Sequence, residues 1–230
     1  MTVKLNPLYQ YKKFKRDDGD GNGRVYVDDL GNKIPSVTSI LSKTKDISHL
    51  LAWRKRIGEA KAKQITEESA GLGTTVHSHL EAYVLGQERP GGNNYGRLMA
   101  KRMADTVIQN GFIHVDEVWG VASHLNYDTI WAGTTDCIGV FKGKPSIIDF
   151  KTTNKPKKIE WIEDYFLQLC AYSMAHDKTF GTNIDRAVIF MCSRDCEYQQ
   201  FEIGGYEMEE YKLKWCNRVN DYYTKYIFKD

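Results

Sequence analysis

The sequence predicts an α/β fold of the α+β type, with one central mixed sheet flanked by helices and a helical N-terminal region. Apolar residues recur at intervals of three and four over residues 36–110, as they do along one face of an amphipathic helix. Residues 112–150 instead hold consecutive short runs rich in β-branched and aromatic residues, which is typical of strands. Further helical and strand patterns follow, so helices both precede and follow the predicted strands.

The chain has 230 residues, of which 41% are hydrophobic and 12% aromatic. This is enough apolar material for a packed core, and no long Pro-, Gly- or Ser-rich linker divides the chain, so we expect residues 1–230 to form a single domain. No apolar run approaches the roughly 20 residues that a membrane-spanning helix needs, and no membrane association is expected. The net charge is only +2, but residues 142–158 hold six lysines against one aspartate. Such a segment indicates either a face that binds a polyanion or a solvated surface.

Four regions follow one another along the chain. Residues 1–35 predict a hairpin or arm that turns at residues 31–32. Residues 36–110 predict helices, with a break at residues 71–73 and an end at residue 86. Residues 111–191 predict strands and a helix, with the strands at 112–119, 121–127, 135–141, 146–150 and 186–191 and the helix at 161–176. Residues 206–228 predict a closing helix.

Two charged residues interrupt an otherwise apolar strand. Asp149 and Lys151 are two residues apart, so their side chains share one face of that strand. A hairpin to the preceding strand brings Asp136 toward the same end and face. Two converging carboxylates would bind a hard divalent cation, and a lysine beside them would orient a water or stabilise charge on a phosphate. A Lys–Asp ion pair on a sheet face is the alternative.

Side chains from two helices extend this group. His77 and Glu81 are spaced i, i+4 and lie on one helix face, which makes them candidate metal ligands. His79 points elsewhere on that helix, and we expect it at the surface. Gln168 and Tyr172 have the same i, i+4 spacing on a later helix. They would close the rim of the site or contact a phosphate, unless they form a polar helix edge packed on the sheet.

The five cysteines are scattered and include no CxxC pair. We therefore expect free thiols in a reducing compartment and no iron–sulfur cluster. The first 24 residues contain acidic side chains and no apolar segment, unlike a secretory signal or a transit peptide. The expected location is the cytoplasm.

Four segments in a fixed order resemble the motifs of a known superfamily. They are 73–81, which contains His77 and Glu81; 133–136, which ends in Asp136; 147–153, which contains Asp149 and Lys151; and 168–172, which contains Gln168 and Tyr172. Together they resemble the PD-(D/E)XK nucleases, in the branch of the RecB-like exonucleases. Within that branch they are most similar to the mitochondrial genome maintenance exonucleases and to phage exonucleases. The resemblance covers residues 35–172 and implies a restriction-endonuclease-like core, although Thr135 stands where the motif usually has proline.

The resemblance also implies a divalent metal site. The ion would be Mg²⁺ or Mn²⁺, and its ligands would be His77, Asp136, Asp149 and the main-chain carbonyl of Phe150. Two further carboxylates are possible ligands, Glu81 and Glu117.

Other residues would act on the substrate. By the resemblance, Lys151 is the catalytic lysine, and Gln168 and Tyr172 are the accessory pair of the RecB-like branch. Three lysines just after the catalytic strand would hold flanking phosphates of DNA, namely Lys155, Lys157 and Lys158.

The function that the resemblance implies is a metal-dependent DNA exonuclease that hydrolyses phosphodiester bonds from single-stranded ends. The expected setting is a phage-encoded enzyme in the host-cell cytoplasm, acting in DNA replication, recombination or degradation with proteins of those processes. Two alternatives stay open: a non-catalytic DNA-binding module on a nuclease fold, and a structure-specific endonuclease.

Overall fold

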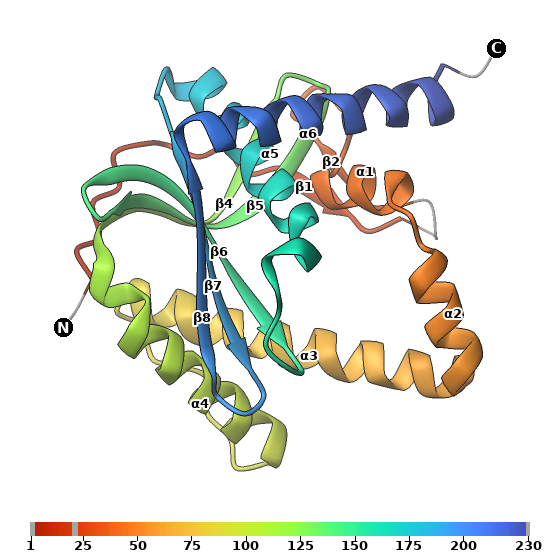
Figure 1. Ribbon diagram of the computed structural model, residues 1–230. Helices are drawn as coiled ribbons and strands as arrows, with labels where there is room; N and C mark the ends of the chain where they lie inside the picture. The colour runs from red at the N-terminus through yellow and green to blue at the C-terminus, as the bar shows by residue number, and fades with distance from the viewer. Residues whose placement is uncertain (1–2, 20–22, 229–230) are drawn as a thin grey trace.

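The computed structural model describes residues 3–19 and 23–228. Figure 1 shows one large sheet with helices on both faces and a small sheet beside it, which is the predicted fold class. The strands are β1 (Lys15–Asp17), β2 (Val25–Val27), β3 (Lys33–Pro35), β4 (Val115–Tyr127), β5 (Trp131–Phe141), β6 (Lys144–Thr153), β7 (Arg186–Ser193) and β8 (Tyr198–Gly204). The helices are α1 (Val37–Thr44), α2 (Ser48–Ile57), α3 (Glu59–Val84), α4 (Tyr95–Asn110), α5 (Glu163–Phe180) and α6 (Gly205–Tyr226). Within the described part of the chain, no helix is long and apolar enough to cross a bilayer.

The central sheet has the strand order β4-β5-β6-β7-β8. Neighbouring strands are antiparallel except β6 and β7, which run parallel. Parallel neighbours need a crossover connection, and α5 lies in that connection. Because β5 and β6 both have a hydrogen-bonded strand on each side, residues on them are held in a fixed register.

Each face of this sheet has its own hydrophobic core. One core joins the sheet to α1, α5 and α6 and contains Ile147. The other joins the sheet to α3 and α4 and contains Ile148 and Phe150. Side chains alternate along a strand, so Asp149, between Ile148 and Phe150, points to the face that α5 covers.

The small sheet consists of β1, β2 and β3 and packs over the start of β5. Tyr26, Ile34 and Ala132 form its core with Phe14. The predicted hairpin corresponds to β2 and β3, which pair in antiparallel register around a turn at residues 28–32. β1 adds a third strand that the sequence pattern did not reveal.

The predicted helix break at residues 71–73 is wrong. α3 continues from Glu59 to Val84 through both glycines of that segment. A Cβ atom on Gly73 would lie 3.3 Å from Oγ1 of Thr152, so glycine here allows α3 to approach β6 closely. The helix does end where predicted, because Gly86 follows it with a φ of +64°.

The strands predicted at 112–119 and 121–127 are one strand. Residues 112–114 form a 3₁₀ turn, and β4 then runs without interruption to Tyr127. Its pairing with β5 shifts in register near Glu117 and Gly120, which is the behaviour of a bulged strand. β8, with its mostly polar sequence, was not predicted at all.

His79 is buried, and its predicted surface position is wrong. Only 1% of this residue is exposed, and neither ring nitrogen has a hydrogen-bond partner among the residues that the structure describes. α3 packs against α4 as well as against the sheet. The helix therefore has a wider buried surface than a single apolar stripe.

Candidate active site

A polar pocket of about 430 Å³ lies between β5, β6, the small sheet, α3 and α5. Its lining contains eight residues selected from the sequence: His77, Glu81, Asp136, Asp149, Phe150, Lys151, Gln168 and Tyr172. The first two belong to α3, the next four to β5 and β6, and the last two to α5. Residues from distant parts of the chain thus meet in one pocket.

The hairpin of β5 and β6 brings two carboxylates together. Cys137 pairs with Ile148, so Asp136 and Asp149 occupy facing positions one residue farther along. The backbone N–H of Phe150 donates a hydrogen bond of 2.8 Å to Oδ2 of Asp136. Asp149 is only 2% exposed. The predicted convergence of the two aspartates is confirmed.

A chain of polar contacts runs from Asp149 to α5. The Lys151 ammonium forms an ion pair with Oδ2 of Asp149. It also donates to Oε1 of Gln168 at 3.3 Å. Nε2 of Gln168 in turn donates to the hydroxyl of Tyr172 at 3.1 Å. The two α5 residues are therefore connected to the lysine rather than forming a detached helix edge.

The charges of this group depend on one another. Burial raises the pKa of Asp149 to about 6, and the Asp136 carboxylate adds to this effect while Lys151 opposes it. Burial acts on Asp136 in the same direction, but the charges of His77 and Lys151 outweigh it and lower the pKa of that carboxyl. For Lys151, burial disfavours the ammonium, yet the two carboxylates raise its pKa. The pocket therefore keeps a charged lysine beside an ionised Asp136.

His77 lies against the first carboxylate. Its Nδ1 is 3.2 Å from Oδ1 of Asp136. Burial favours the neutral imidazole, but Asp136 outweighs burial and raises the pKa of His77. The imidazole is thus coupled to the same carboxylate with which it was expected to share a metal ion.

The donor set fits a hard divalent cation. Oδ2 of Asp149 is buried, and apart from the Lys151 ammonium it has no polar partner among the described residues. No group of three His, Cys, Asp or Glu side chains in the described chain is arranged to enclose a metal ion. Mg²⁺ commonly binds to one or two carboxylates and takes its other ligands from water and substrate phosphates. Two facing carboxylates in an open polar pocket match that requirement.

The two further candidate carboxylates differ in position. Glu81 lines the pocket one helical turn after His77. Glu117 does not line it, because its carboxylate accepts hydrogen bonds from Nε1 of Trp119 at 2.6 Å and from Lys4 at 3.0 Å. The structure does not bring Glu117 to the site.

The lysines predicted to bind DNA lie near an exposed tryptophan. A second pocket, of about 420 Å³, has a lining that includes Lys155, Lys157, Trp161, Tyr165 and Arg194. Trp161 is 62% exposed. The Lys158 ammonium lies 5.7 Å from the centre of the Trp161 ring. An exposed aromatic ring among cations is a typical surface for single-stranded nucleic acid.

Two arginines in the first pocket were not selected from the sequence. Arg16 and Arg24 line it from the small sheet, next to Tyr26. The alternation of Arg24 with Tyr26 in the sequence could have indicated that both side chains share one strand face. Arg16 could be assigned to the same face only from the pairing of β1 with β2. Tyr26 is only 1% exposed, so its ring is not available to stack on a base.

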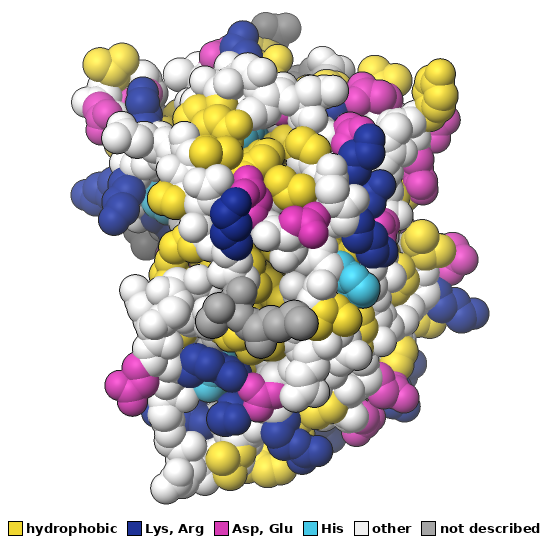
Figure 2. Space-filling model, turned by 90° about the vertical axis from the view of Figure 1, so that its left-hand side faces the viewer, with side chains coloured by type: hydrophobic (Ala, Val, Ile, Leu, Met, Phe, Trp, Pro, Cys, Tyr) yellow, Lys and Arg dark blue, Asp and Glu magenta, His cyan; other side chains and the backbone are white. Residues whose placement is uncertain are grey.

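The face of the molecule shown in Figure 2 carries side chains of both charges. On the face shown in Figure 2, basic and acidic side chains are intermixed and separated by hydrophobic ones. In the described part of this face, the basic groups are thus interrupted by acidic and hydrophobic side chains.

Comparison with known proteins supports the exonuclease resemblance. No protein-family model matches the chain. The chain is 27% identical over 214 residues to the mitochondrial genome maintenance exonuclease 1 of Homo sapiens. The aligned region covers 84% of this chain and 59% of the relative. It is 28% identical over 207 residues to the protein of the same name from Mus musculus, covering 84% of this chain and 60% of the relative. The chain thus spans about three fifths of the length of these relatives.

Among solved structures, the chain is similar to a putative exonuclease from Eubacterium rectale. It has a TM-score of 0.47 and 11% identity, over 66% of this chain and 63% of that one. The two relatives described above are mammalian and give no support to the expected phage origin. The predicted resemblance to the PD-(D/E)XK exonucleases named for mitochondrial genome maintenance is confirmed by the similarity in sequence.

Proposed function

We propose that the protein is a Mg²⁺- or Mn²⁺-dependent DNA exonuclease that hydrolyses phosphodiester bonds from single-stranded ends. The observation that carries this proposal is the meeting of Asp136, Asp149 and Lys151 in one pocket. The similarity to proteins named exonucleases supports it. A cytoplasmic location, and a role beside replication or recombination proteins, stay predictions.

Asp136 and Asp149 would hold the metal ion, with His77 and the carbonyl of Phe150 as the other proposed ligands. When bound, such an ion neutralises phosphate oxygens and lowers the pKa of a bound water. The hydrogen bond from the Phe150 N–H leaves Oδ2 of Asp136 with a further lone pair. That bond also fixes the orientation of the carboxylate before any ligand arrives.

Lys151 would act as a positive charge and as a hydrogen-bond donor. Its ammonium has three N–H groups, of which Asp149 and Gln168 engage two. The third is left for an oxygen of the attacking water or of the phosphate. Because the two carboxylates raise its pKa, Lys151 holds its proton in the metal-free site.

Gln168 and Tyr172 would position the lysine. Burial raises the pKa of Tyr172, so its hydroxyl stays protonated. Since the Tyr172 oxygen accepts from Gln168, the hydroxyl proton remains available to a substrate oxygen. The amide of Gln168 is thereby held with its oxygen toward Lys151.

The second pocket would receive the strand beyond the cleaved bond. Tyr165 lines this pocket, and the Lys151 ammonium of the first pocket lies 4.9 Å from the centre of the Tyr165 ring. A strand that passes Lys151 can therefore place a base near Trp161 and its phosphates near Lys155 and Lys157. Phosphate contacts of this kind make binding weaken as salt is added.

The test is digestion of an end-labelled single-stranded oligonucleotide, in Mg²⁺, in Mn²⁺ and in EDTA, beside a circular strand of the same sequence. The variants are Asp149→Asn and the matched control Asp195→Asn, which removes an exposed carboxylate. We expect metal-dependent loss of the linear strand by the wild type and by the control, an intact circle, and no cleavage by Asp149→Asn.

Other outcomes would redirect the assignment. Cleavage of the circle would favour the structure-specific endonuclease. Binding of the strand without cleavage in either metal would leave only the DNA-binding module. Full activity of Asp149→Asn would overturn the proposed site.

A further inference from the structure

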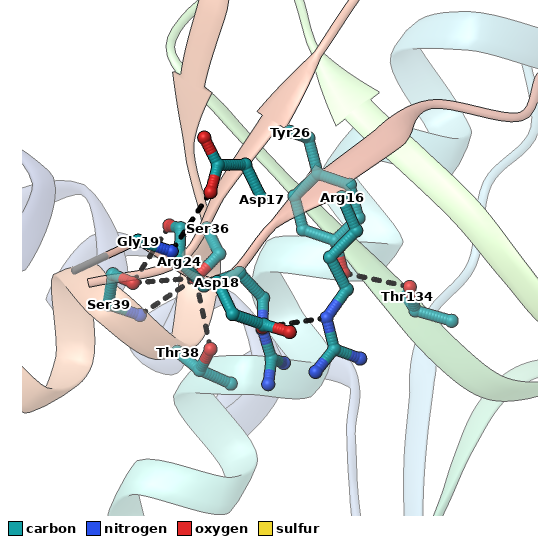
Figure 3. Close-up of polar contacts among 10 residues, drawn as sticks. All are labelled: Arg16, Asp17, Asp18, Gly19, Arg24, Tyr26, Ser36, Thr38, Ser39 and Thr134. Carbon is teal, nitrogen blue, oxygen red and sulfur yellow. Dashed lines mark hydrogen bonds and ion pairs between the residues drawn. The ribbon is translucent and has the colours of Figure 1, made fainter. Parts of the chain in front are cut away.

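Two arginines face the candidate active site from the small sheet. Figure 3 shows the guanidinium groups of Arg16 and Arg24 side by side and pointing the same way, with Asp18 between them. Both side chains line the pocket that contains Asp136 and Asp149. None of the roles considered so far uses them.

The register of the small sheet explains why both arginines face the pocket. Arg16 on β1 pairs directly with Tyr26 on β2, so the two side chains lie on one face of the sheet. Arg24 precedes Tyr26 by two residues and shares that face. The Tyr26 hydroxyl forms a hydrogen bond of 2.8 Å with Oγ1 of Thr134 on β5. This contact ties the arginine-bearing face to β5 two residues before Asp136.

The backbone of Arg24 is fixed by the start of α1. Its carbonyl accepts hydrogen bonds from the N–H of Ser36 at 3.0 Å and from the hydroxyl of Ser39 at 2.9 Å. Gly23 permits this approach, since its φ is +95° and a Cβ there would lie 2.9 Å from Oγ of Ser39. Arg24 is therefore held in place before a ligand binds.

Asp18 organises the guanidinium groups without using up their donors. Its Oδ1 accepts from Nε of Arg16 at 2.8 Å and from Nε of Arg24 at 2.7 Å. The Nη atoms of both arginines have no hydrogen-bond partner among residues 3–19 and 23–228. The trio carries a net charge of +1, and it presents parallel N–H groups of the kind that bind a phosphate.

We propose that Arg16 and Arg24, held together by Asp18, bind a phosphate of the DNA strand that neighbours the phosphate being hydrolysed. This inference rests on the proposed nuclease function, because it takes the occupant of the pocket to be a nucleic acid strand. The cleaved phosphate lies at Asp136 and Asp149, and the arginine pair provides the next anionic position on the side of the small sheet. The second pocket, which adjoins Lys151 through Tyr165, would hold a further part of the strand.

Binding rather than cleavage tests this proposal. A short, labelled single-stranded oligonucleotide is titrated in EDTA, so that no bond is broken, and affinity is measured by fluorescence anisotropy over a range of salt. A series of oligonucleotides carries one neutral methylphosphonate at each position in turn, and one further member lacks its terminal phosphate. The test variant is Arg16→Gln/Arg24→Gln.

The matched control is Lys15→Gln/Lys33→Gln, which removes two charges from the same small sheet. Lys15 and Lys33 both pair with Val27, so they lie on the sheet face opposite to the arginines. A second test variant, Arg16→Lys/Arg24→Lys, keeps the charge but loses the planar guanidinium groups that bind a phosphate through two parallel N–H bonds. This variant is used in place of the glutamine variant if the glutamine variant does not fold.

For the arginine variants we expect a loss of about tenfold or more in affinity, as for one lost set of charge-assisted hydrogen bonds. For Arg16→Gln/Arg24→Gln the slope of log affinity against log salt should also fall by about 0.7, the value for one phosphate of a single strand, whereas Arg16→Lys/Arg24→Lys should keep the slope because it keeps the charge. One methylphosphonate position should weaken binding to the wild type and to the Lys15→Gln/Lys33→Gln control. It should weaken binding less to Arg16→Lys/Arg24→Lys and not at all to Arg16→Gln/Arg24→Gln. If the sensitive position is the terminal phosphate, the pair recognises an end rather than an internal phosphodiester.

If affinity depends on the methylphosphonate position in the same way for the wild type and for the arginine variants, the proposed phosphate site is wrong. Metal-dependent cleavage by the wild type would in that case leave the nuclease proposal intact. A wild type that neither binds nor cuts any strand would overturn both.

Discussion

The ring of Tyr172 occupies the space beside Gly133 that a side chain would need. A Cβ atom on Gly133 would lie 2.5 Å from Cε1 of Tyr172 and 2.9 Å from its hydroxyl oxygen. Gly133 is on β5, three residues before Asp136, and Tyr172 is on α5. Glycine at this point of the motif is therefore explained by packing, since it lets the α5 residue reach across the start of β5 to the site.

We expect Gly133→Ala to destabilise the protein by about 1–3 kcal/mol, the usual cost of an added methyl group in a packed core. It should also lower the cleavage rate, because a displaced Tyr172 cannot hold Gln168 toward Lys151. Urea unfolding measures the first effect and single-turnover cleavage the second.

The clash can be separated from other effects of the alanine by a double-mutant cycle. In a Tyr172→Ala background, where the ring is absent, Gly133→Ala should cost much less stability than in the wild type. Equal costs in both backgrounds would show that the ring is not what excludes a side chain at position 133.

Addition of Mg²⁺ or Mn²⁺ should stabilise the wild-type protein against heat. At a metal concentration 100 times the dissociation constant the gain is about 2.7 kcal/mol. For a chain of this length that corresponds to a rise of several degrees in Tm. Asp149→Asn should lose the rise, whereas Asp195→Asn should keep it. A metal-induced rise that survives in Asp149→Asn would place the ion elsewhere.

Much of the fold followed from periodicity. The helices, the central strands and the sharing of one face by Asp149 and Lys151 depend on local spacing, which a sequence displays directly. The pairing of Asp136 with Asp149 followed from a tight hairpin, where register is set by the turn. These relations are local in sequence, and they were predicted.

What could not be predicted depends on contacts between distant segments. Nothing near Glu117 in sequence reveals that Lys4 reaches its carboxylate from the N-terminal segment. His79 has the spacing of a surface position, and only the packing of α4 on α3 buries it. Arg16 enters the pocket because β1 pairs with β2, and strands of three residues are too short to show a periodicity in the sequence.

Trp161 provides a test of the second pocket. Because the ring is 62% exposed, Trp161→Ala should leave the free energy of unfolding nearly unchanged. It should weaken single-strand binding by about 1–3 kcal/mol, the value of one stacked base, and Trp161→Phe should restore most of the loss.

The matched control is Tyr206→Ala, which removes an aromatic ring that is 95% exposed on α6, outside both pockets. Anisotropy titrations in EDTA give the affinities. Equal affinities for the wild type and Trp161→Ala would exclude stacking on this ring.

His176 on α5 is a buried, neutral histidine with both ring nitrogens engaged. The Thr182 hydroxyl donates to Oδ1 of Asp177 at 2.6 Å, so its oxygen accepts from Nδ1 of His176 at 2.8 Å. The proton therefore resides on Nδ1, and Nε2 accepts from the Tyr11 hydroxyl at 3.2 Å. Burial lowers the pKa of His176 to about 4.

This shift predicts a loss of stability in acid. An unfolded histidine takes up a proton below a pH of about 6.5, whereas the folded protein resists protonation of His176 down to about 4. The unfolded state thus binds more protons in this window, and the free energy of unfolding falls as the pH falls through it. Between pH 7 and pH 5 the contribution of His176 should decrease by about 2 kcal/mol.

Urea unfolding of the wild type and of His176→Gln at several pH values isolates this contribution. The glutamine variant loses hydrogen bonds and is expected to be less stable at pH 7, but it cannot be protonated at this position. The difference in stability between the two proteins should therefore narrow as the pH is lowered. His79 and His124, whose pKa values burial also lowers, are present in both proteins and cancel. A difference that stays constant from pH 7 to pH 5 would mean that His176 is protonated as readily in the folded protein as in the unfolded chain.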